Sequence, residues 1–271
     1  MKKLFLTILF VISVLTLCFA GNPLSDFYYD LDDNGLLVIT GIKKKKSDKQ
    51  DGNALPHIEI ASQYEGITVN EVRIADCKDR YGIYCRIYDC ELKLPESLRI
   101  LDIDAFGLSL VRIVNLPKSL VTCKLRKQDF NGMTPIEILD SIGNAVNLKN
   151  VSLENVKTGS NTFVFKKTWN TEDCTFVLPD VTELVIEEGC QSVATFSYCN
   201  NLKKVKLPST IKLISDKAFT KCELLSEIII PETILSIRFN INEQNFYETN
   251  LSLSTKSRLR KLGYRGKFGT E

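Results

Sequence analysis

The chain reads LKKVKLP at residues 202–208 and LSEIIIP at residues 225–231, and this Leu-x-x-Val-x-Leu-Pro phrase recurs along much of its length. Copies of the phrase lie 20 to 23 residues apart where it is cleanest. A fixed period of this length is typical of a solenoid. One repeat cannot bury its apolar side alone, so the sequence predicts that neighbouring repeats stack on one another.

Apolar triplets predict one strand in each repeat. Alternation with a period of two directs the outer residues of a triplet inward and the central residue outward. Proline follows several triplets, which is tolerated where a strand stops, because proline cannot donate to a ladder. The predicted strand cores are 72–74, 92–94, 114–116, 151–153, 184–186, 205–207, 228–230 and 251–253.

A second phrase separates the strands, seen as ISDKAFTKC at residues 214–222 and LDIDAF at residues 101–106. We interpret it as a tight turn or short helix on the other side of the coil, with its phenylalanine filling the core. Residues 117–150 and 154–180 fit the period poorly, and their glycines and proline indicate loops.

These phrases together resemble the BspA-like leucine-rich repeats of bacterial and protist surface proteins, most closely over residues 184–237 and more weakly over 70–254. The opening YDLDDNGLLVITG at residues 29–41 also resembles the strand-turn-strand start common in those proteins. The resemblance implies a repeat solenoid with an N-terminal β-hairpin, and a secreted or surface-attached binding protein that is not an enzyme. The expected segments are a hairpin cap at 21–69, the solenoid at 70–254 and a basic tail at 255–271.

The first twenty residues indicate a secretory signal peptide, because two lysines precede an apolar run that ends in small residues. We expect cleavage after Ala20, with lipid attachment at Cys18 as the alternative. Leu17 argues against the lipid, since it occupies a position that is small in lipoprotein signals. The mature chain is then expected to be secreted, extracellular or at the cell surface, with no transmembrane segment.

The balance of charge bears on which partners the chain binds. Without Lys2 and Lys3, 33 basic residues face 33 acidic ones, a balance that does not favour nucleic acid. The basic runs at 43–46 and 256–267 are interpreted as solvated, with an anion-binding patch as the alternative for the second.

Eight cysteines remain after signal cleavage, and an even number in an exported chain permits disulfides. The cluster Cys77, Cys85 and Cys90 is expected to hold one bridge. Cys199 and Cys222 occupy equivalent places in adjacent repeats and are expected to form a bridge, a thiol pair or a stack of buried thiols. Only Cys85 and Cys90 have the spacing of a zinc-ligand pair, and no second close pair of cysteine or histidine accompanies them, so neither metal nor cofactor is expected.

Catalytic and metal patterns are weak. His57 is the single histidine and lies in an alternating strand pattern without a glycine-bracketed serine. Asp30, Asp32 and Asn34 match half of a calcium loop, but Gly41 replaces the final glutamate, so a hairpin turn is the better interpretation. A secreted hydrolase using carboxylates or His57 stays as an alternative function.

The outward strand positions form the predicted binding surface. Stacked in register, they give one column through Glu71, Glu91, Asn150, Glu183, Lys204, Glu227 and Asn250, and another through Arg73, Lys93, Ser152, Val185, Lys206, Ile229 and Ser252. The candidate binding residues are Glu183, Lys204, Lys206, Glu227 and Ile229. Such a broad face suits an extracellular macromolecule, protein or glycan, better than a small substrate. An envelope component that self-associates through open solenoid ends is the third hypothesis.

Overall fold

The computed structural model describes residues 21–43, 55–75, 86–106, 109–128, 134–170, 174–239 and 244–269. The predicted signal peptide, Cys77, Cys85 and the lysines at 44–46 lie outside the described residues.

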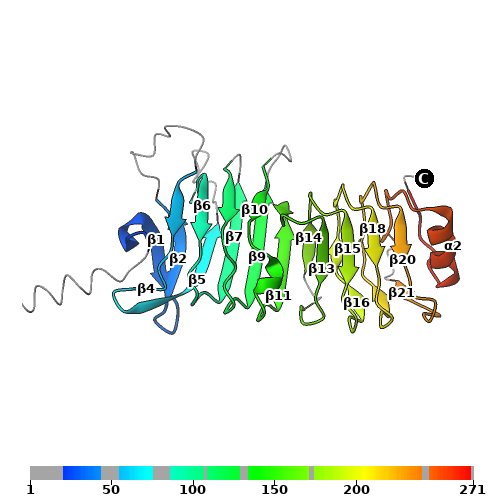
Figure 1. The fold of residues 1–271 in the computed structure, drawn as a ribbon, viewed down its shortest axis with the longest axis horizontal. Coiled ribbons are helices and arrows are strands. Elements are labelled where there is room, and N and C mark those ends of the chain that lie inside the picture. Colours follow the sequence, from blue (N-terminus) through cyan, green and yellow to red (C-terminus); the bar gives the residue numbers. More distant parts are fainter. Residues whose placement is uncertain are drawn as a thin grey trace, which may run out of the picture.

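The chain winds into an elongated solenoid whose strands lie side by side along the long axis (Figure 1). An antiparallel hairpin, β1 (Phe27–Leu31) with β2 (Leu37–Ile42), forms one end, and α2 (Leu253–Lys261) lies at the other. Each turn of the coil brings the chain back in its original direction, so strands of successive coils pair in parallel. The solenoid architecture predicted from the repeats is confirmed.

Four sheets run along this coil. The nine-stranded sheet has the order β1, β2, β5 (Ile67–Ala75), β7 (Ile100–Phe106), β9 (Thr122–Gln128), β11 (Asn150–Glu154), β14 (Thr175–Val177) and β17 (Thr195–Phe196), with β4 (Gln63–Tyr64) on β5. The five-stranded sheet contains β3 (His57–Glu59), β6 (Cys90–Lys93), β8 (Val111–Ile113), β10 (Ile136–Ile138) and β12 (Val156–Lys157). The four-stranded sheet contains β13 (Thr162–Phe165), β15 (Glu183–Ile186), β18 (Lys204–Lys206) and β20 (Glu227–Ile229). The three-stranded sheet contains β16 (Ser192–Val193), β19 (Leu213–Ile214) and β21 (Arg238–Phe239). Short 3-10 turns lie at η2 (Leu24–Asp26) and η3 (Ile142–Asn144).

The core lies inside the coil and is built by alternation along each strand. In β9, Cys123 and Leu125 are buried, whereas Lys124 and Arg126 point to solvent. A continuous cluster of buried side chains extends in this way from Phe27 to Tyr264. Because each coil buries its apolar residues on its neighbours, the stack is the unit of stability.

Phenylalanines form a column through the C-terminal coils. Phe176 stacks on Phe196 with ring centroids 4.6 Å apart, and Phe219 and Phe246 continue the column at 6.4 and 5.8 Å. All four side chains are almost fully buried. The prediction that Phe219 fills the core is confirmed.

The predicted turn or short helix at residues 101–106 is wrong, because this segment lies in strand β7. Leu101, Ile103 and Ala105 are buried; the first two pair with both β5 and β9, and Ala105 pairs with β9. In the C-terminal repeats the equivalent strand is short, as β19 ends before Lys217, which has a φ of 54°. The coils therefore contain more strands than the single one expected for each repeat.

Two predicted strand cores are also wrong. The strand predicted at 114–116 begins three residues earlier, as β8, and the triplet itself is irregular and leads to Pro117. The strand predicted at 251–253 is replaced by the start of α2, because the side chain of Ser252 accepts a hydrogen bond from the N–H of Thr255 and caps the helix.

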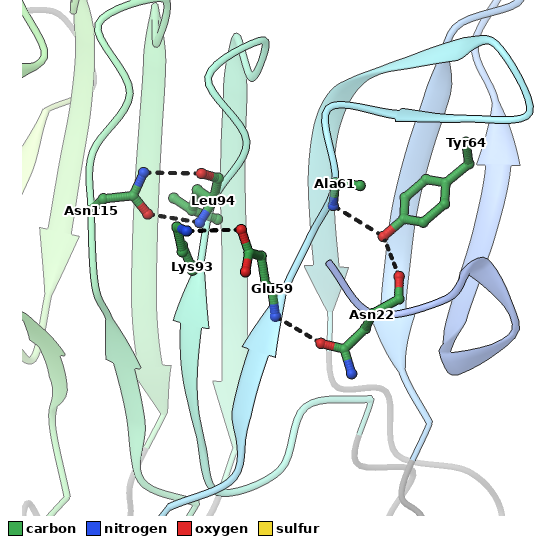
Figure 2. Close-up of polar contacts among 7 residues, drawn as sticks. All are labelled: Asn22, Glu59, Ala61, Tyr64, Lys93, Leu94 and Asn115. Atoms are coloured by element: carbon green, nitrogen blue, oxygen red, sulfur yellow. Dashed lines mark hydrogen bonds and ion pairs between the residues drawn. The ribbon is translucent and has the colours of Figure 1, made fainter. Parts of the chain in front are cut away.

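Asn115 explains why β8 ends early. Its side-chain oxygen accepts a hydrogen bond from the N–H of Leu94 at 2.7 Å, and its amide donates to the Leu94 carbonyl at 2.9 Å (Figure 2). The side chain thus takes the place of a neighbouring strand where the ladder stops.

We expect Asn115→Ala to lower the free energy of unfolding by about 1–3 kcal/mol, because it leaves both partially buried main-chain groups without this partner. Asn115→Asp is the control, since it keeps the acceptor and loses the donor, and it should cost less in urea unfolding. Equal stability of wild type and Asn115→Ala would show that water replaces the amide at no cost.

The N-terminal end is tied to the first coil. The Asn22 side chain accepts from the N–H of Glu59 at 2.8 Å, and the Tyr64 hydroxyl donates to the Asn22 carbonyl at 2.9 Å (Figure 2). In the hairpin, one Asp32 oxygen accepts from the N–H groups of Asn34 and Leu36, and Gly35 supplies a φ of 73°. The Asp-Asn-Gly segment is thus a hairpin turn, as predicted.

Candidate binding face

The outward side of the four-stranded sheet, hereafter the binding face, brings the five predicted residues together. One row pairs Glu183, Lys204 and Glu227 across β15, β18 and β20. The next row pairs Val185 with Lys206 and Ile229. Whether these residues bind a partner stays a prediction, but their placement in two adjacent rows follows the predicted register.

Ion pairs on this face form both within a row and between rows. Lys204 pairs with Glu227 of the same row at 3.1 Å, whereas Glu183 pairs diagonally with Lys206 at 2.6 Å. The hydrogen bond from Lys206 lowers the pKa of the Glu183 carboxyl. Each cation is therefore held over a neighbouring strand, and the face presents fixed pairs of opposite charge.

The second row is mostly apolar, and Lys206 separates Ile229 from Val185 in it. β13 extends the second row with Val164, which pairs with Val185 in register. At the other side of the sheet, Ile229 is 38% exposed. The binding face thus combines partly exposed apolar residues with ion pairs, and sequence reasoning missed Val164 because residues 154–180 fit the repeat period poorly.

A groove of about 450 Å³ lies beside β13, where the five-stranded sheet ends and the four-stranded sheet begins. Apolar side chains of Leu139, Ile142, Val164 and Trp169 line it together with polar groups from the turns after β10 and β12. Leu139 is 56% exposed, an uncommon exposure for a leucine beside a groove. The binding face therefore continues into a concave surface.

Hydrogen bonds along β13 show which of its main-chain groups face the groove. The carbonyls of Asn161 and Phe165 accept hydrogen bonds from N–H groups of the next coil. The main-chain groups of the residues between them alternate in direction, so those of Thr162 and Val164 point away from that coil. Ser160 provides partners for the main chain of Thr162, because its hydroxyl accepts a hydrogen bond from the Thr162 N–H and donates one to the Thr162 carbonyl. Val164 is the next alternate residue, and its peptide group faces the groove.

The continuous columns predicted along the whole chain are wrong in the N-terminal half. Glu71, Arg73, Asn150 and Ser152 lie on the nine-stranded sheet, and Glu91 and Lys93 lie on the five-stranded sheet. Asn250 and Ser252 precede and cap α2. Strands of the different sheets have similar sequences, so the repeat pattern alone did not show which sheet each strand joins.

The described cysteines are buried, and no disulfide joins any two of them. Cys90, a member of the cluster predicted to hold one bridge, is 3% exposed, and the other two members, Cys77 and Cys85, lie outside the described residues. Cys199 and Cys222 stack in adjacent coils, where their thiols donate to the carbonyls of Phe176 and Phe196. Contact with Cys199 and burial raise the pKa of the Cys222 thiol.

His57 lies in a row of alternating charge on the five-stranded sheet rather than in a catalytic cluster. Its Nδ1 is 3.9 Å from Glu91, which also pairs with Arg112, and Glu137 and Lys157 complete the row. Among the described residues, no group of three or more metal-ligating side chains occurs. Within the same ranges, no helix is both long and apolar enough to span a membrane.

Parallel strands stacked with a period near that of the Leu-x-x-Val-x-Leu-Pro phrase define a leucine-rich-repeat solenoid. Residues 171–264 match the family model of the BspA type leucine rich repeat region, in six copies. This match supports the sequence resemblance to BspA-like leucine-rich repeats over these residues.

Two solved structures resemble the chain. The leucine rich repeat protein of T. pallidum matches with a TM-score of 0.50 and 20% sequence identity, covering 93% of this chain and 100% of that chain. A leucine rich cell surface protein from Faecalibacterium prausnitzii A2-165 matches with a TM-score of 0.26 and 13% identity, covering 92% and 99%. The first likeness supports the fold, and the second is too low to support any conclusion. None of the curated proteins compared with the chain matches it.

Proposed function

We propose that this chain is an exported leucine-rich-repeat protein that binds an extracellular protein or glycan through the binding face. The observation that carries the proposal is the row of Val164, Val185, Lys206 and Ile229, in which partly exposed apolar residues lie beside two ion pairs. Export is supported by the signal pattern of residues 1–20.

The character of the face favours a macromolecule. Its charges are already paired within the sheet, so recognition depends on matching a pattern of charge over several strands. Val164 and Val185 lie side by side at the β13 side of that pattern, where a partner excludes water from them. The adjoining groove offers room for one protruding side chain or sugar of the same partner.

The test exploits the pairing of these charges. The variant Glu183→Lys/Lys204→Glu/Lys206→Glu/Glu227→Lys exchanges the members of both ion pairs, so attraction within the sheet is kept while the pattern offered to a partner is inverted. We expect affinity for the partner to fall at least roughly 30-fold, because each charged group of the partner then faces a charge of its own sign. Thermal unfolding of the variant should match that of the wild type.

Binding is measured against an array of purified matrix proteins, glycans and cell-envelope fractions. The matched control Arg126→Glu/Glu154→Arg exchanges an ion pair on the nine-stranded sheet and should leave binding unchanged. A partner bound equally well by the first variant contradicts the assignment of the face. Absence of saturable binding across the array contradicts the proposed function.

A further inference from the structure

The cations of the C-terminal end differ from those of the sheets. On the sheets, most lysine and arginine side chains form ion pairs with neighbouring carboxylates, as Arg112 does with Glu137 and Arg126 with Glu154. Residues 253–269 contain six cations and no acidic residue. They are Lys256, Arg258, Arg260, Lys261, Arg265 and Lys267. None of the six forms an ion pair with a carboxylate of the described residues.

Helix α2 covers the last coil (Figure 1), and its two sides differ in burial. Thr255 and Leu259 are buried against the coil. At 100° per residue the opposite side of the helix carries Leu253, Arg260 and Lys261, and all three are exposed. The outer end of the solenoid is therefore a cationic surface.

Part of this charge has a structural role. Arg258 donates to the carbonyls of Pro231 and Ile234, and Arg260 donates to the Tyr264 carbonyl and lies 4.6 Å from the Phe268 ring centroid. Cations in the last turn of a helix also favour its dipole. These contacts do not involve the ammonium groups of Lys261 and Lys267, which are exposed. Clustered like charge lowers stability, so packing of the end does not explain these two lysines.

Two exposed leucines border the cations. Leu253 begins α2 and is 85% exposed, and Leu235 is 86% exposed. Leu235 lies in the turn between β20 and β21 whose carbonyls accept from Arg258, so it lies beside the helix. Exposed apolar side chains next to unpaired cations are typical of surfaces that contact the interfacial region of a membrane.

We propose that the C-terminal end of the solenoid, formed by α2 and residues 262–269, docks on a membrane surface rich in anionic phospholipids. Lys261 and Lys267 contact phosphate groups, and Leu235 and Leu253 enter the headgroup region. The solenoid axis then points away from the membrane, and the binding face is left free at the side.

The experiment is co-sedimentation of the folded chain from residue 21 with vesicles. Vesicles of phosphatidylcholine alone should not bind, whereas those containing phosphatidylglycerol should bind with an affinity that falls as salt is raised. Each cation at an anionic surface contributes roughly a fivefold change in affinity, so Lys261→Gln/Lys267→Gln should weaken binding by roughly 25-fold. Leu235→Ser/Leu253→Ser should also weaken binding, without any change in charge.

The matched control removes the same charge elsewhere. Lys118→Gln/Lys149→Gln alters two exposed lysines of the N-terminal coils and should retain binding. Equal losses in the two lysine pairs, or no binding to anionic vesicles, would overturn the proposal. Soluble polyphosphate tests whether the site binds a soluble polyanion in place of a phospholipid surface. If it binds as tightly as the vesicles, and vesicle binding is unaffected by the leucine variant, the site recognises a polyanion and the membrane assignment fails.

Discussion

Replacing Phe196 by alanine is expected to lower the free energy of unfolding by about 3–5 kcal/mol, the usual cost of removing a buried aromatic ring. Phe196 is 1% exposed and lies in the centre of the phenylalanine column. Its ring stacks on Phe176 at 4.6 Å and lies 6.4 Å from Phe219, so one substitution interrupts contacts between three coils. No neighbouring ring can fill the cavity without leaving its own coil.

Trp169 provides the measurement. It is the single tryptophan and packs with Phe163 and Phe165 at 5.8 and 5.4 Å. Its fluorescence in urea reports the coils next to the substitution, and circular dichroism reports all strands. We expect both midpoints to fall. Leu235→Ser, at an 86% exposed position, is the control and should change stability by less than about 0.5 kcal/mol. A similarly small effect of Phe196→Ala would show that the column does not hold the coils together.

The C-terminal coils could be predicted because their sequence signals agree with one another. Val205 and Ile228 are apolar, Pro208 and Pro231 end the strands, and the register between these coils follows directly. The same regularity placed Phe219 in the core. Periodicity is a reliable guide here because each coil has nearly the same length and meets the same neighbours.

Pattern failed where a side chain replaces main-chain pairing. Asn115 takes the place of a strand beside Leu94, and Ser160 does the same for Thr162. Both residues look like loop residues in sequence, because their polar side chains serve turns and strand ends equally well. The groove beside β13 lies at the edge of the four-stranded sheet, where Ser160 provides partners for the main chain of Thr162, so the repeat pattern did not predict it.

The division into several sheets was also beyond the pattern. β7 and β18 both show alternation of apolar and charged residues, yet they belong to different sheets. Alternation tells which side of a strand is buried but not which neighbouring strand it meets. The predicted columns therefore hold over three neighbouring coils at the binding face and fail beyond them.

Alkaline pH is expected to destabilise the protein strongly, because its buried thiols cannot ionise without losing their apolar surroundings. Burial raises the pKa of Cys90 and Cys123 from 9.0 to about 12, with smaller contributions from Asp89 and Asp102 respectively. Burial likewise raises the pKa of Cys190 to about 11. An unfolded chain loses these protons near its ordinary thiol pKa, whereas the folded chain retains them.

The direction of the pH effect follows from this difference. Below the unfolded pKa of 9.0, both states keep the proton and stability is complete. As pH rises towards about 12, the unfolded state gains the advantage of ionisation. At about pH 11, Cys90 and Cys123 together should cost roughly 5 kcal/mol relative to about pH 8. The loss should be steepest between those values.

The variant Cys90→Ala/Cys123→Ala isolates this contribution. Its stability at neutral pH should be lower, because two cavities replace the thiols, but its decrease between about pH 8 and about pH 11 should be smaller than that of the wild type by roughly 5 kcal/mol. Tyrosine and lysine ionisation affects both proteins alike and cancels in the comparison. Urea unfolding under reducing conditions, repeated at each pH, gives the dependence of the unfolding free energy on pH for both proteins. Identical slopes would mean that these thiols ionise as easily in the folded coil as in the unfolded chain, which their burial between stacked strands opposes.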